Sequence, residues 1–264
     1  MSQELNFAIY AIKKNIQNSA ELRTSFLTNI FGMTLNNTAF IILWMFFAKS
    51  VGNINGWQAI DIIAMLGFGT LCYGFAFSVA GGLMKIPEYV TSGSFDRFML
   101  SPKNLLLRIA TSSFTISAIG DVIFGLICLA IYGFLIKISL LQILLILVMI
   151  VVSNIVFMAM IIAIYSTSFL FVDANNVTRG LFELFLTPSL FHGGAFQGAT
   201  RFFFTFIIPS LLIGALPVEI VKNISLAKLV LITILACLWL FLSLKIFKAG
   251  IKKYESSNLM TFGS

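Results

Sequence analysis

The feature that most constrains this chain is a series of long apolar segments, each able to cross a lipid bilayer as one helix. A membrane-spanning helix needs about 20 largely apolar residues. The segments that meet this length are residues 25–48, 57–83, 105–136, 139–172 and 226–247. Only 10% of the residues are charged, against about 25% in soluble domains, so a water-facing surface cannot be built. The sequence predicts an all-α polytopic membrane protein with a single domain, residues 1–264.

The stretch between the fourth and last apolar segments, residues 173–225, is apolar but interrupted by prolines and glycines. In the favoured interpretation, a fifth span covers residues 176–192 and a re-entrant helical hairpin follows at 196–221. In the alternative, residues 173–198 lie at the membrane interface and the span covers residues 200–217. Both interpretations predict six transmembrane helices.

The distribution of lysine and arginine predicts the orientation of these spans. With the N-terminus inside, 12 of the 17 lysines and arginines fall on the cytoplasmic side, as the positive-inside rule requires. The remaining basic residues, on the outside, are Lys49, Lys137, Arg201, Lys222 and Lys228. An even number of spans also puts both termini on one side, so the two arguments agree on an N-in, C-in topology.

The first 23 residues are too polar to span the membrane. Leu5, Ile9, Ile12 and Ile16 recur at helical spacing. This pattern predicts an amphipathic interfacial helix on the inner membrane surface.

Residues 84–104 form a charged, turn-rich island between the second and third apolar segments. Pro87 suits the first turn of a helix, where its missing N–H is not needed. Gly93 suits the position after a helix end, where the left-handed conformation is accessible. We therefore expect a helix of one to two turns over residues 87–92, with Ser94 and Asp96 capping the next turn.

The island also carries apolar side chains on a segment that is otherwise exposed: Phe95, Phe98, Met99 and Leu100. Exposed apolar patches often mark contacts with other molecules. One interpretation is a docking helix received by a groove on a soluble partner. The other is a plain cytoplasmic loop whose phenylalanines dip into lipid.

Polar and ionisable residues within the apolar segments are candidates for a translocation path or for the polar core of the bundle, because such residues are costly in lipid. These candidates are Asn36, Asn37, Asp121 and Asn154. We expect Asp121 to bond to Asn154, Ser153 or Thr115, a structural role favoured over proton transfer. Asn36 and Asn37 either face a cavity between subunits or bond to a neighbouring helix.

Two further acidic residues have simpler interpretations. Asp61 lies near the outer end of the second apolar segment, where we expect water to solvate it. Glu183 follows Arg179 by four residues, a spacing that favours an ion pair within one helix.

Several classes of site are absent from the sequence. No G-x-x-x-x-G-K-[ST] motif is present, so any ATP and Mg²⁺ that drive the protein must be bound by another chain. His192, the only histidine, has no ligand at metal-binding spacing. Cys72, Cys128 and Cys237 lie in apolar runs and predict no disulfide framework. The net charge of +7 reflects cytoplasmic lysines and arginines and does not indicate nucleic-acid binding.

Four stretches resemble ABC-2-type export permeases. In the island, "YVTSGSFDRFMLSPKN", the similarity is carried by Val90, Gly93, Phe95, Asp96, Met99, Leu100 and Pro102, with Phe95 where the family more often has leucine. In "ISAIGDVIFG" it is carried by Gly120, Asp121 and Gly125. In "RFFFTFIIPSLLIGALP" it is carried by Arg201, Phe202, Pro209 and Pro217. In the tail it is carried by Gly250, Lys252, Lys253, Tyr254 and Ser256.

The resemblance implies the membrane subunit of an ATP-binding-cassette exporter, which is not itself an enzyme. Its island would contact a separate ATPase dimer, which binds ATP and Mg²⁺, through Pro87, Glu88, Tyr89, Gly93, Phe95, Asp96 and Arg97. Its broken segment would form an external gate that includes Arg201, Phe202, Pro209 and Pro217. The other partners implied are the lipid bilayer and a second permease, different from this chain or a copy of it. The expected location is the cell membrane of a bacterium, and the expected substrate is an amphipathic peptide, drug or lipid-like molecule.

Two other functions are compatible with the residues. An ion-gradient-driven secondary transporter would use Asp121, although such proteins usually carry repeated halves and no repeat is visible here. A non-transporting scaffold or immunity protein would tolerate changes at Gly93 and Asp96 without loss of function.

Overall fold

The computed structural model describes residues 2–21, 23–52, 55–171 and 174–254, and the regular structure in these ranges is helical. The longer helices are α1 (Ser2–Ala20), α2 (Arg23–Val51), α3 (Ala59–Ala80), α7 (Ser117–Ile136), α8 (Leu140–Ser166), α9 (Ala174–Ser189) and α12 (Leu226–Ile251). The shorter α-helices are α4 (Ile86–Thr91), α5 (Asp96–Met99), α6 (Leu105–Ala110), α10 (Gly198–Phe202) and α11 (Ala215–Asn223). The short 3-10 helices, which are tighter than α-helices, are η1 (Gly81–Lys85), η2 (Thr167–Phe169), η3 (Gly193–Ala195) and η5 (Ser210–Leu212), and η4 (Phe203–Ile207) is a wider π-helical turn.

The described ranges contain five helical segments long and apolar enough to cross a membrane. They are Arg23–Phe46, Ala59–Thr91, Ser117–Ile136, Leu140–Phe169 and Leu226–Ile251. They coincide with the five apolar segments, which confirms a multi-pass, all-helical membrane protein. Because the hydrocarbon core offers no water to exposed backbone groups, such segments have few alternatives to a helix.

The third apolar segment, which is longer than a bilayer requires, is not one continuous helix. It consists of α6, a non-helical stretch at residues 111–116, and α7. The Ser112 hydroxyl donates to the carbonyl of Ile109, which offers the backbone an alternative to a continuous helix. The N–H of Thr115 donates instead to the carbonyl of Phe77 in α3, at 3.3 Å. The chain therefore turns where its backbone bonds to the neighbouring span.

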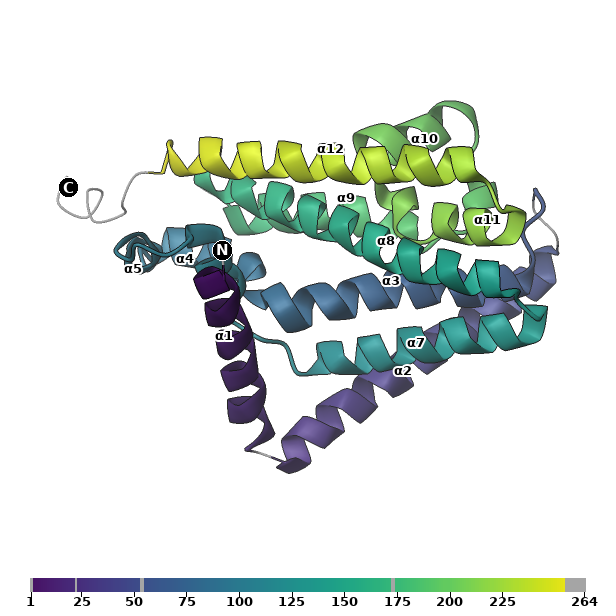
Figure 1. Cartoon of the computed structure of the whole chain (residues 1–264), viewed down its shortest axis with the longest axis horizontal. Helices are drawn as coiled ribbons and strands as arrows, with labels where there is room; N and C mark the ends of the chain where they lie inside the picture. The colour runs from purple at the N-terminus through teal and green to yellow at the C-terminus, as the bar shows by residue number, and fades with distance from the viewer. Residues whose placement is uncertain (1, 22, 53–54, 172–173, 255–264) are drawn as a thin grey trace.

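Figure 1 shows the long helices lying side by side, with two ends that differ in content. One end holds α4, α5, α1 and the last turn of α12, and we call it the island end. The opposite end holds α10 and α11, and we call it the far end. Helix α1 runs across the ends of the spans rather than along them, as an interfacial helix would, and Ile9 and Tyr10 on it are exposed. The first turn of α1 and the last turn of α12 both lie at the island end, the arrangement that the predicted N-in, C-in topology requires.

The sixth span stays a prediction. Helix α9 leads from the island end, where it contacts α4, towards the far end, where the His192 ring lies 6.2 Å from that of Trp57. Its 16 residues fall short of the roughly 20 that a span needs. The alternative span over residues 200–217 is wrong, because the helix there breaks at Pro209 and again at Gly214. The re-entrant hairpin predicted at residues 196–221 stays a prediction, and the structure has a series of short helices there.

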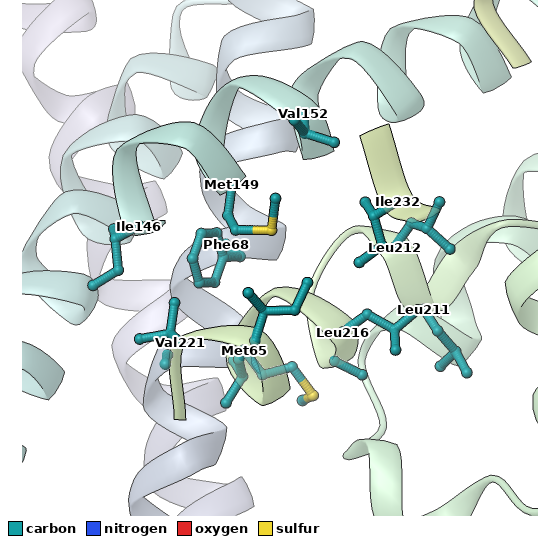
Figure 2. Packing of buried hydrophobic residues seen from close by; sticks show 14 of the residues in the cluster. Met65, Phe68, Ile146, Met149, Val152, Leu211, Leu212, Leu216, Val221 and Ile232 are labelled. Carbon is teal, nitrogen blue, oxygen red and sulfur yellow. The ribbon is translucent and has the colours of Figure 1, made fainter. Parts of the chain in front are cut away.

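These short helices pack into the core of the bundle at the far end. Figure 2 shows side chains of α3, α8, η5, α11 and α12 meeting in one apolar cluster, among them Phe68, Met149 and Leu212. Helices α3 and α7 also approach closely: a Cβ atom on Gly74 would lie 2.6 Å from the carbonyl oxygen of Ala118. Small residues at such crossings let membrane helices pack backbone to backbone.

Candidate functional site

The backbone of the island has the predicted form. Pro87 lies in the first turn of α4, and Gly93 has φ +68°, in the left-handed region that favours glycine. The predicted capping of the second helical turn is wrong, because α5 begins after Phe95 without a capping side chain. Asp96 instead accepts a 3.0 Å hydrogen bond from the hydroxyl of Tyr254, beyond the end of α12.

Phe95 holds the island against the bundle. Its side chain is fully buried, with its ring centroid 5.0 Å from that of Phe169 and 4.8 Å from that of Tyr254. The expectation that Phe95 is exposed is therefore wrong, because aromatic rings from η2 and the C-terminal segment enclose it. Its part in coupling to another protein stays a prediction, and any such part would be indirect.

Further contacts tie the island to neighbouring helices. The hydroxyls of Tyr89 and Ser112 lie 3.0 Å apart. The guanidinium of Arg108 in α6 donates to the carbonyl of Phe98 at 2.6 Å. At the end of the island, the N–H of Asn104 donates to the Glu4 carboxylate of α1 at 3.3 Å. The island is thus a braced element rather than a free loop.

The outward surface of the island is formed by other residues. Glu88 and Arg97 are exposed, and Leu100 is the most exposed apolar side chain of the island at 85%. Burial, together with the Asp96 carboxylate, raises the pKa of Tyr254 to about 12. The Tyr254 hydroxyl therefore stays protonated at neutral pH and keeps donating to Asp96.

A second polar site lies between α2 and α7. The side-chain amide of Asn37 donates to Oδ1 of Asp121 at 2.6 Å, and both residues are buried. Asp121 bonds to none of the three partners expected from the sequence, Thr115, Ser153 and Asn154. The Ser153 and Asn154 side chains donate instead to the carbonyls of Leu212 and Ile150, and α7 packs against α2 and α3. Asn36 is exposed and lines the same cavity as Asp121.

The third site is a polar pocket of about 570 Å³ at the far end. One guanidinium nitrogen of Arg201 donates to both carboxylate oxygens of Glu219, at 2.7 and 2.9 Å. The Lys228 ammonium pairs with the same carboxylate at 3.1 Å. Lys222 pairs with Asp61 at 2.6 Å. The expectation that water solvates Asp61 is wrong, because α11 brings Lys222 against its buried carboxylate.

The other predicted gate residues divide into two kinds. Pro209 and Pro217 are buried, with Pro209 directly before η5 and Pro217 in the first turn of α11. Phe202 is 59% exposed and packs its ring on Phe206, 4.9 Å away. A gating role for this segment stays a prediction.

Residues 33–258 match the family described as ABC-2 family transporter protein. The chain belongs to this family. The match covers the island, Asp121 and the far-end pocket. No curated protein matches the chain. Members of the ABC-2 family are membrane transport components and are not themselves catalytic.

Some residues of this ABC-2 transporter protein were missed by the sequence analysis. Glu219 anchors two cations of the far-end pocket but was not recognised as a site residue. The one sequence signal for Glu219 is its position three residues before Lys222 in an otherwise apolar stretch. The Arg179–Glu183 pair was predicted and is confirmed, at 3.4 Å between two exposed side chains. A pair so exposed stabilises the helix by only about 0.5 kcal/mol.

Proposed function

We propose that this chain is the permease subunit of an ATP-driven exporter in a bacterial cell membrane, coupled through the island to a separate ATPase. A second permease, different or identical, completes the translocation path for an amphipathic substrate. ATP and Mg²⁺ are bound by the ATPase, since this chain has no phosphate-binding loop.

The observation that carries the proposal is the combination of a rigid base and an exposed apolar tip in the island. Phe95 and Tyr254 hold the base against the spans. Met99 and Leu100 are 49% and 85% exposed at the tip. A rigid element of this kind transmits a movement of a bound soluble protein to the bundle, whereas a flexible loop would move without displacing the spans.

The proposal makes the tip the contact with the ATPase. Replacing Leu100 with aspartate is expected to lower recovery of an ATPase subunit about tenfold, the loss expected when an apolar anchor worth about 1.4 kcal/mol is removed from an interface. The measurement is capture of the full-length chain from its native membrane in mild detergent, with the co-purifying proteins quantified by mass spectrometry.

Leu226→Asp is the matched control. Leu226 is 75% exposed but lies at the far end, in the first turn of α12, where a negative charge is tolerated. We expect it to leave capture of the ATPase unchanged. Equal capture by wild type and Leu100→Asp would contradict docking through the tip, and capture of the wild-type chain alone would contradict the exporter function.

A further inference from the structure

The two carboxylate oxygens of the buried Asp121 differ in their hydrogen bonding. Oδ1 accepts the bond from Asn37, but Oδ2 is buried and has no hydrogen-bond partner among the described residues. An asparagine at position 121 could make the same bond to Asn37 without any charge. A carboxylate held away from water without a partner for its second oxygen is costly. The bond between Asn37 on α2 and Asp121 on α7 therefore does not by itself explain why position 121 carries a charged residue.

Asp121 lines a cavity of about 290 Å³ formed by residues of α2, α3, α7 and the α9 region. Its walls are mainly apolar and aromatic, with Phe40, Leu66, Tyr73 and Leu186 among them. Among the residues that the structure describes, no lysine or arginine lines it and Asp121 is the one formally charged group in the lining. The volume is at the small end of ligand pockets, which span about 300–1,000 Å³. It suits a charged group with one ring or a short chain, and excludes a folded peptide.

Asn36 and Tyr73 also line the cavity, whereas the polar side chains of Asn37, Thr70 and Ser189 are engaged within the protein. The Thr70 hydroxyl donates to the carbonyl of Leu66 in its own helix at 2.8 Å. The Asn37 amide is bonded to Asp121. Oδ2 of Asp121, buried at the cavity wall and without a partner among the described residues, is the charged acceptor of the lining, and its charge selects a cation.

We propose that this cavity binds the ammonium group of an amphipathic cation, with Oδ2 of Asp121 accepting its hydrogen bond. Asn37 holds the carboxylate in place, and Phe40 and Tyr73, which also line the cavity, supply aromatic contacts for the cation and the carbons next to it. The inference rests on the proposed function, because it names the chemical class of molecule that the permease accepts.

The test is calorimetric titration of the full-length chain, purified with any subunits that accompany it, with 4-phenylbutylammonium and with its neutral analogue 4-phenylbutanol. We expect the ammonium to bind at least tenfold more tightly than the alcohol. Asp121→Asn, which retains a partner for Asn37, is expected to abolish this preference, and Asp121→Glu to retain part of it.

A second variant tests the cavity without touching the carboxylate. A Cβ atom at Gly69, which lines the cavity, meets nothing within 4 Å, so a side chain at this position begins in open space, and Gly69→Phe is the variant that adds bulk to the lining. We expect it to weaken binding of the ammonium at least tenfold. The inference is overturned if the ammonium and the alcohol bind equally, if neither binds, or if Asp121→Asn keeps the preference.

Binding in this experiment requires neither ATP nor the ATPase, so it separates the inference from the proposed function. A chain that binds the ammonium but captures no ATPase supports the site and contradicts the exporter. A chain that captures an ATPase and lacks the ammonium preference supports the exporter and overturns the site.

Discussion

Replacing Lys222 with methionine is expected to lower the free energy of unfolding by about 3–5 kcal/mol, the usual cost of breaking a buried ion pair by removing one partner. The Asp61 side chain is only 3% exposed, and Lys222 is its one cationic partner in the described chain. Its remaining donors are the N–H of Gln58, at 2.9 Å, and the Tyr132 hydroxyl, at 3.4 Å. Neither carries a charge. The measurement is equilibrium unfolding of the purified protein in mixed micelles, followed by circular dichroism.

The double variant Asp61→Asn, Lys222→Met separates the ion pair from packing. It removes both charges together, and we expect it to recover most of the stability lost in Lys222→Met, because the buried anion is gone. Lys228→Met provides a comparison, since Glu219 keeps Arg201 as a partner. A loss in Lys222→Met no larger than in Lys228→Met would show that Asp61 does not depend on Lys222.

The spans and the turns of the island were predictable because both depend on local properties of the chain. A segment of about twenty apolar residues in a bilayer forms a helix, because only a helix satisfies its backbone hydrogen bonds within the segment. Pro87 and Gly93 act through their own backbone dihedral angles. By contrast, the break at residues 111–116 depends on a bond from Thr115 to Phe77, and no local pattern reveals that partner.

The partners of the polar residues could not be predicted for the same reason. Asp121 bonds to a residue 84 positions away, and Asp61 to one 161 positions away. Such pairs depend on which helices are neighbours and on their rotation about their own axes. The partners expected for Asp121 were Thr115 and, on α8, Ser153 and Asn154, whereas the partner found is Asn37 on α2. Which helix a polar group faces is decided by backbone packing, such as the close approach of α3 and α7 at Gly74.

Replacing Phe95 with alanine is expected to cost about 3–5 kcal/mol, the range for deleting a fully buried phenylalanine. The loss falls on the base of the island, because Phe95 packs on Phe169 and Tyr254. The island then opens locally, and we expect faster proteolysis within residues 84–104 together with weaker capture of the ATPase. Leu100→Asp, in contrast, should weaken capture while leaving proteolysis unchanged, because Leu100 is 85% exposed and contributes little packing.

Two controls define the outcome. Phe134→Ala removes the same side chain from a position that is 84% exposed on α7, so its effect on stability should be small. Tyr254→Phe keeps the ring and removes only the hydroxyl that donates to Asp96, a loss of about 1 kcal/mol. If Phe95→Ala loosens the island and the ATPase is still captured and still drives export, the rigid base is not needed for coupling. The exposed tip alone would then make the contact, and the island would hold the ATPase at the membrane without transmitting its movement to the spans.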